Sequence, residues 1–136
     1  MKAWMWPAFA AFAMWGVWAF LPKLVVQSMS ARSAIVYEAL GGALVALGVV
    51  IYLGFRVETD ARGIGLAMLT GVLGVGGALA YLIALTRGPV SLIAVSSALY
   101  PVLTIVLAYF VLHEPISAKQ MIGIVLAFIA MVLIAT

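Results

Sequence analysis

The sequence predicts an all-α membrane protein with five transmembrane helices. Of its 136 residues, 68% are hydrophobic and only 8% are charged, whereas roughly a quarter of the residues in a soluble domain are charged. The apolar residues form long runs that are separated by short polar segments. A spanning helix needs about 20 residues, each rising about 1.5 Å, to cross about 30 Å of hydrocarbon, and each run is of about that length. We therefore expect a multi-pass integral protein of the inner or plasma membrane, with the lipid bilayer as its first partner.

The expected spans cover about residues 4–26, 32–55, 63–85, 90–112 and 118–135, within one domain of residues 1–136. The first is rich in aromatic residues, including Trp15, and meets a charged residue only at Lys23. The second places an acid, Glu38, in the apolar stretch IVYEALGG. Gly41 and Gly42 lie at i+3 and i+4 from Glu38, so we expect this acid to face packed protein and not lipid.

The other three spans begin at recognisable helix-start signals. Asp60 is placed to cap the third helix, because its carboxylate can accept a free backbone N–H. Gly88 and Pro89 separate the third and fourth helices, since glycine tolerates the left-handed conformation after a helix and proline suits the first helical turn. Before the fifth helix, Ser117 and Gln120 have the spacing of a capping box.

Small residues recur at helical spacing on two of the helices and predict close helix approach. On the third helix these are Ala67, Gly71, Gly74 and Ala78, and on the fifth they are Gly123, Ala127 and Ala130. Both sets are packing surfaces. The set on the fifth helix packs either within one bundle or against a second subunit.

The basic residues give little instruction about orientation. Five spans place Lys2, Arg56, Arg62 and Lys119 on one side of the membrane, and Lys23, Arg32 and Arg87 on the other. Excess positive charge marks the cytoplasmic side, and four against three is almost no excess. The chain is expected either to insert in both orientations, which allows an antiparallel homodimer, or to hold one orientation set by the single-residue bias.

Glu38 has three possible roles. An ionisable group inside a span is a functional-site hypothesis, and burial of an unpaired carboxylate favours its protonated form, as a proton or cation site requires. Alternatively, Glu38 forms an ion pair with Lys23, since the two lie about 9–10 Å and about 7 Å below the shared end of their helices at 1.5 Å per residue. The third possibility is that Glu38 reaches the membrane surface.

The fourth span has a proline, Pro101, near its midpoint. Proline cannot donate to the carbonyl of Ser97, so the helix is expected to kink there. Ser97, Pro101, Thr104 and Ala108 share one face, and such a weakly polar stripe suits a translocation path. The alternative is an ordinary kinked helix whose hydroxyls bond to its own carbonyls. The complete candidate pathway comprises Ser97, Tyr100, Pro101, Thr104, Tyr81 and Trp15.

Several other classes of function are excluded or disfavoured. The chain has no cysteine, which excludes thiol catalysis and thiolate metal sites. One histidine and four acids cannot supply a catalytic set or a metal cluster, so we expect neither an enzyme nor any metal or cofactor. The small and scattered positive charge offers no basic patch to a nucleic acid.

Several motifs are similar to the EamA domain of the drug/metabolite transporter superfamily. The second half of that domain is resembled by Ala84, Leu85, Gly88, Pro89, Val90 and Ser91, by Leu99, Tyr100, Pro101, Val102 and Thr104, and by His113, Glu114, Pro115, Gln120 and Gly123. Its start is resembled by Trp15, Gly16, Pro22 and Lys23. The resemblance covers essentially the whole chain. The five expected spans separate the chain from the four-helix small multidrug resistance proteins, whose first helix carries an acid; the first expected span here has none.

The resemblance implies a transporter, and most members of that family resemble two such domains in tandem. A single domain therefore favours a homodimer. Glu114 is then either a charged latch at the membrane surface or a solvated helix end paired with Lys119 or Arg62. Together with His113 beside it, it is a candidate gate or helix-end residue.

We expect a secondary transporter that exports small metabolites or amphipathic compounds by alternating access. The alternatives are a membrane accessory or scaffold subunit, and a flippase of lipid-linked substrates, which would need a lateral opening toward lipid.

Overall fold

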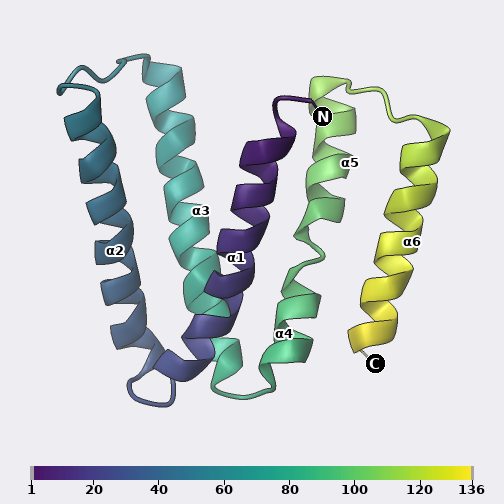
Figure 1. Cartoon of the computed structure of the whole chain (residues 1–136), viewed down its shortest axis with the longest axis horizontal. Coiled ribbons are helices and arrows are strands. Elements are labelled where there is room, and N and C mark those ends of the chain that lie inside the picture. Colours follow the sequence, from purple (N-terminus) through teal and green to yellow (C-terminus); the bar gives the residue numbers. More distant parts are fainter. Residues whose placement is uncertain (1, 136) are drawn as a thin grey trace. The chain divides into compact units, whose positions relative to one another are not determined.

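The structure is a computed structural model that describes residues 2–135, and this part of the chain contains helices and no strand. The helices are α1 (Met5–Val25), α2 (Ala31–Tyr52), α3 (Ala61–Leu85), α4 (Val90–Ser97), α5 (Tyr100–Leu112) and α6 (Ala118–Ala135) (Figure 1). The predicted all-α class is thereby confirmed. The chain forms two compact units, one ending at Arg87 with α1–α3 and the other beginning at Gly88 with α4–α6.

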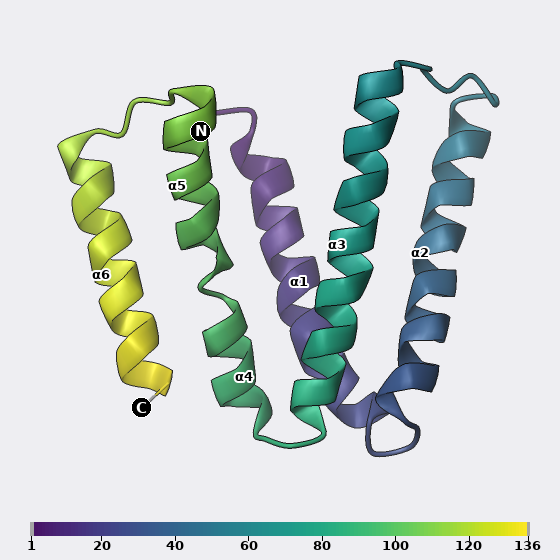
Figure 2. The ribbon, with the colours of Figure 1, turned by 180° about the vertical axis from the view of Figure 1, so that it is seen from behind.

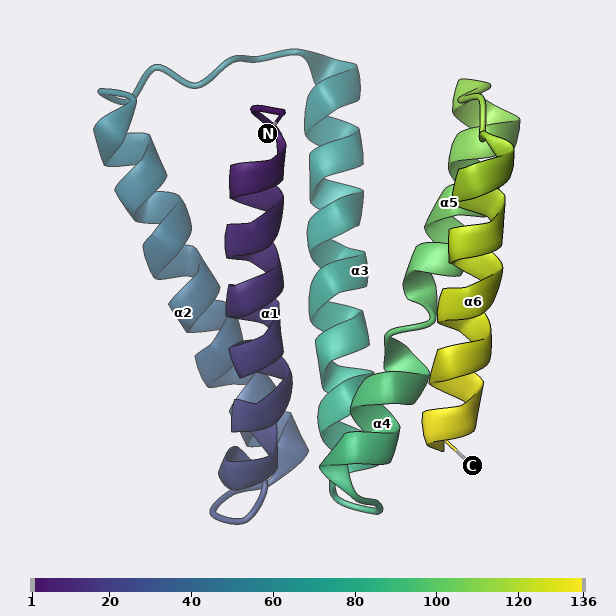
Figure 3. The same cartoon turned by 45° about the vertical axis from the view of Figure 1, so that its right-hand side comes forward.

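In the first unit the helices alternate in direction, so that the α1–α2 loop and the α2–α3 loop lie at opposite ends (Figure 1). Figure 3 shows α1 and α3 running side by side, and the two are in contact. The buried residues come from the end of α1, the start of α2 and the end of α3. They are Pro22, Ala31, Ala34, Ala78, Tyr81, Leu82 and Leu85. The core of this unit therefore lies at one end, while most large apolar side chains elsewhere are exposed, as lipid contact requires.

The second unit consists of the broken span α4–α5 and of α6, which contacts α4. Residues Ala98 and Leu99 interrupt the helix, as Figure 2 shows from behind. Pro101, the second residue of α5, has no N–H for the carbonyl of Ser97, four residues earlier, so the ladder opens here. The expected kink is thus a full interruption between two short helices.

Four stretches of the described chain are long and apolar enough to cross a membrane. They are α1, α2, α3 and the stretch Val90–Leu112, which joins α4 and α5. α6 has 18 residues and is shorter than these, and it rises about 27 Å at 1.5 Å per residue. This length is at the lower limit for a spanning helix, and the fifth span stays a prediction.

Two predicted helix caps are confirmed. The backbone N–H of Gly63 donates to Asp60 Oδ2 at 2.6 Å, which caps α3. At the start of α6, Gln120 N–H donates to Ser117 Oγ at 3.3 Å, and Ser117 N–H donates to Gln120 Oε1 at 2.8 Å. These are the reciprocal bonds of a capping box.

α2 ends in a tight turn. The N–H of Phe55 donates to the carbonyl of Val50 at 3.0 Å, and that of Gly54 to Ile51 at 3.0 Å, which is the Schellman pattern. Gly54 has φ 59° and Phe55 has φ 61°. Two successive residues therefore adopt the left-handed conformation, although only the first is a glycine.

The expectation of a left-handed Gly88 is wrong. Among the glycines that the structure describes, only Gly54 has a positive φ. Thr86 ends α3 instead, and its hydroxyl donates to the carbonyl of Ile83 at 2.7 Å. Pro89 is the extended residue before α4. Glycine at 88 relieves crowding, because a Cβ there would lie 3.2 Å from the side chain of Ile93.

Candidate functional site

The candidate site is a polar cluster in the first unit, built by one side chain from each of its three helices. The indole Nε1–H of Trp18 on α1 donates to Glu38 Oε1 on α2 at 2.9 Å. The ring of Trp18 stacks on that of Tyr81 on α3, with 5.6 Å between the centroids and 25° between the planes. The hydroxyl of Tyr81 donates to the carbonyl of Ala19 at 2.8 Å. The cluster therefore joins the three helices through polar contacts and a ring contact.

Tyr81 is placed by the core of the unit. It is 7% exposed, and Ala78 and Leu85, one turn away on either side, are also buried. A buried phenol needs a hydrogen-bond partner, and the carbonyl of Ala19 accepts its bond with a second lone pair. Trp18, whose indole stacks on this ring, is 38% exposed as a residue, so one part of this aromatic pair remains accessible.

Lys23 closes the packed end of the cluster. Its ammonium donates to the carbonyl of Leu85, the last residue of α3, at 2.8 Å. A cation at a helix C-terminus is favourable, because the last carbonyls lack helical partners and carry partial negative charge. The sequence left open whether Glu38 forms an ion pair with Lys23, serves as a proton or cation site, or reaches the membrane surface. In the structure, Lys23 donates to the carbonyl of Leu85, and Glu38 accepts a hydrogen bond from the indole of Trp18.

Glu38 faces protein, but not for the expected reason. No described atom of another element lies within 4 Å of a Cβ built at Gly41 or Gly42. This glycine face is therefore open within the chain, and the contact that holds the acid is the indole of Trp18. Glu38 itself is half-buried.

Trp18 is the residue of the cluster that sequence reasoning missed, since Trp15 was selected instead. Trp15 is 61% exposed and lies one turn earlier on α1. The available signal was helical spacing, because Trp18 precedes the buried Pro22 by four residues and so shares its face.

The fourth-span residues lie in the second unit. Ser97 Oγ donates to the carbonyl of Ala94 at 2.9 Å, and Thr104 Oγ1 to that of Tyr100 at 3.2 Å. Both hydroxyls thus bond to their own helices, as in the alternative considered from the sequence. Ser97, Tyr100, Pro101 and Thr104 are all exposed. Among the candidate pathway residues, Tyr81 is the one that joins the cluster with Glu38.

The predicted gate residues end α5. His113 takes the left-handed conformation, with φ 55°, and the N–H of Glu114 donates to the carbonyl of Ala108 at 3.3 Å. Both residues line a shallow pocket of about 300 Å³ together with Tyr109, Phe110 and Pro115. The packing residues Gly123, Ala127 and Ala130 are exposed on α6. No cluster of three or more His, Asp or Glu side chains that could hold a metal is present in the described chain.

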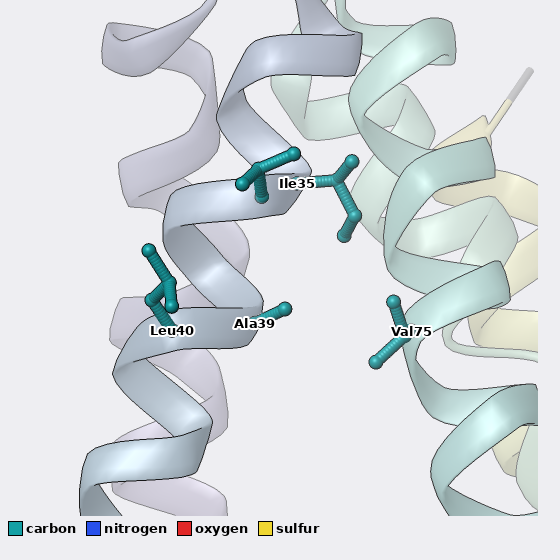
Figure 4. A pocket seen from close by; sticks show the side chains of 5 residues that line it. Ile35, Ala39, Leu40 and Val75 are labelled. Atoms are coloured by element: carbon teal, nitrogen blue, oxygen red, sulfur yellow. The ribbon is translucent and has the colours of Figure 1, made fainter.

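A second feature of the first unit is an apolar groove of about 380 Å³ between α2 and α3. It is lined by Ile35, Val36, Ala39, Leu40 and Val75, without polar surface. Figure 4 shows Ile35 and Ala39 directed toward α3, and Val75 directed back toward α2. The groove has no group that could recognise a charge, so it cannot replace the polar cluster as a binding site for a polar substrate.

Comparison with known proteins covers nearly the whole chain. Residues 2–136 match the sequence profile of the EamA-like transporter family. An uncharacterized protein of Methanocaldococcus jannaschii is 31% identical over 123 residues, which are 89% of this chain and 88% of that protein. No solved structure matches the chain.

Proposed function

The chain belongs to the EamA-like transporter family, and we propose that it exports small metabolites or amphipathic compounds by alternating access. It is an integral membrane protein and a transporter in general terms. We place it in the inner or plasma membrane as an antiparallel homodimer. An inverted pair of identical units would supply the two opposed halves between which many transporters hold their substrate.

The observation that carries this proposal is the ionisable Glu38 inside a spanning helix, held by a neutral donor. The Trp18 indole satisfies one oxygen of the carboxylate without neutralising its charge. A charge at this depth is costly unless it serves a function or has a partner. Glu38 therefore suits a group that takes up a proton or a substrate cation in one state and releases it in another.

The break in the fourth span supports movement. α4 and α5 meet at residues 98 and 99 without a continuous helical ladder. Discontinuous helices are typical of transporters, in which broken segments bind the substrate or change direction. We propose that Ser97, Tyr100, Pro101 and Thr104 line the path, and that the Ser97 and Thr104 hydroxyls turn from their own carbonyls toward the substrate.

The near balance of positive charge supports dual insertion, with four basic residues against three. The exposed small residues Gly123, Ala127 and Ala130 on α6 suit a contact with a second copy. Reporter fusions to the C-terminus test the orientation. Signal from both sides of the membrane is expected, and signal from one side alone would refute the antiparallel dimer.

Transport is tested with purified protein in liposomes. The vesicles are loaded with labelled leucine, labelled glucose or ethidium, and efflux is measured from pH 5.5 to pH 8.5. We expect efflux of at least one compound to depend on pH, and E38Q to abolish that dependence. Glu58 is an exposed acid in the α2–α3 loop, so E58Q is the matched control and should behave as the wild type. Efflux by E38Q that still varies with pH would remove Glu38 from the mechanism.

A scaffold function is separated from transport by labelling. The chain has no cysteine, so S97C introduces a single thiol. This thiol should react with a membrane-impermeant maleimide if a water-filled path reaches it. Absence of labelling in an active preparation would place Ser97 outside the path, and absence of both labelling and efflux would favour the accessory subunit.

A further inference from the structure

We propose that Glu38, Trp18 and Tyr81 form a recognition site for a monovalent organic cation with an aromatic or alkyl body. This inference rests on the proposed transport function and names the class of substrate. Three properties of the cluster carry it: the acceptor capacity of the carboxylate, the accessible aromatic surface beside it, and the positions of the neighbouring cations.

The carboxylate has unused acceptor positions. Its two oxygens offer about four acceptor sites, and the described contact from Trp18 occupies Oε1. Glu38 is half-buried, so a ligand can approach the carboxylate while part of it is shielded from water. An ion pair in such surroundings is stronger than one at an exposed surface, because the local dielectric constant is lower.

The aromatic pair favours a cation over a neutral molecule or an anion. The face of a tryptophan ring attracts a cation within about 6 Å of its centroid, and tryptophan is the strongest of the aromatic side chains in this respect. Tyr81 covers one face of Trp18 at 5.6 Å and is itself buried. Trp18 as a whole residue is 38% exposed, and its indole N–H holds Glu38. A cation bound there would contact both a negative charge and a π face.

The basic side chains near the cluster lie farther along the helices or are directed to other groups. Lys23 lies at a depth similar to that of Glu38, and its ammonium donates to the carbonyl of Leu85 at 2.8 Å. Arg32 precedes Glu38 by six residues, about 9 Å along α2. α3 contains one basic residue, Arg62, and it lies at the opposite end of this helix from Tyr81. The cluster itself therefore carries a formal negative charge from Glu38, whose described contact is the neutral N–H of Trp18, whereas an anionic substrate would need a cation directed at it.

The experiment measures equilibrium binding of radiolabelled tetraphenylphosphonium to the full chain in detergent, with empty micelles subtracted. We expect saturable binding by the wild type and at least tenfold weaker binding by E38Q. Glutamine can still accept the Trp18 bond, so this variant retains the fold, which size exclusion and circular dichroism verify. W18F, which weakens the π face and removes the N–H, should bind about threefold to tenfold more weakly. The matched controls are E58Q and W6F, since Glu58 and Trp6 are exposed and lie outside the cluster.

Three results would overturn the assignment. These are no saturable binding by the wild type, equal binding by E38Q and the wild type, and binding of the anion 8-anilinonaphthalene-1-sulfonate that E38Q weakens as strongly. The result also separates this inference from the proposed function. Efflux of leucine or glucose without cation binding would refute the cation site and leave the transporter intact. Cation binding without efflux of any probe would retain the site and refute transport.

Discussion

Replacement of Tyr81 by phenylalanine should destabilise the first unit by a small and specific amount. The change removes one hydroxyl, which donates to the carbonyl of Ala19 at 2.8 Å, and leaves the ring that stacks on Trp18. The ring stays in its place because Tyr81 is 7% exposed and surrounded by the core. The carbonyl of Ala19 keeps its own helical partner, so no acceptor is left without a bond.

The magnitude follows from these contacts. A hydrogen bond within a protein contributes about 0.5–1.5 kcal/mol net, and hydrogen bonds between membrane helices average about 0.6 kcal/mol. We therefore expect Y81F to lower the free energy of unfolding by about 0.6–1.5 kcal/mol. Y81A also removes the ring, and it should cost about 3–5 kcal/mol by analogy with other buried aromatic side chains.

The assay is equilibrium unfolding in mixed micelles with increasing dodecyl sulfate, followed by circular dichroism. Tyr37 provides the control, because it is 65% exposed on α2, and Y37F should change the free energy of unfolding by less than about 0.5 kcal/mol. Equal stability of Y81F and Y37F would refute the argument that the Tyr81–Ala19 bond joins α3 to α1.

Three further predictions concern helix ends and the broken span. F55G should raise the free energy of unfolding by about 0.5–1 kcal/mol, because a left-handed L-residue is strained. Its control Y52G, inside α2, should lower the free energy of unfolding by a similar amount. Lower stability of both variants in the same unfolding assay would contradict this reasoning. D60A should lower it by about 1 kcal/mol through loss of the α3 cap, while D60N should retain most of the stability; equal loss in both would argue against capping. P101A restores an N–H for the carbonyl of Ser97 and should slow hydrogen exchange at residues 98–100 as α4 and α5 merge. Unchanged exchange at these residues would show that Pro101 does not cause the break.

The sequence was sufficient for the all-α class and for the local chemistry of helix ends. The caps at Asp60 and Ser117 were predictable because each depends on residues three positions apart, and both bonds form. Glu38 was identified as a candidate because an acid in an apolar run is conspicuous at any rotation of the helix. Such features need no knowledge of how helices pack.

The partners of Glu38 and Lys23 were not predictable in the same way. Matching depth in the membrane suggested that the two could meet, but depth does not determine how each helix is rotated about its axis. Trp18 reaches Glu38, and Lys23 is directed to Leu85 on α3. The prediction of a left-handed Gly88 was wrong for a related reason. Thr86 ends α3, and the turn needs no left-handed residue at position 88.

The position of the core within the first unit has a mechanical consequence. The end of α1, the start of α2 and the end of α3 are packed together, whereas the opposite ends of these helices contain no buried residue among those described. Each helix can thus tilt about a pivot at its packed end. α3 has 25 residues and is about 37 Å long. A tilt of about 10° about its packed end would therefore displace its opposite end by about 6 Å. The cluster of Glu38, Trp18 and Tyr81 lies next to this packed end, where the same tilt moves atoms least. Its three side chains can therefore stay in contact while the far ends of the helices swing apart.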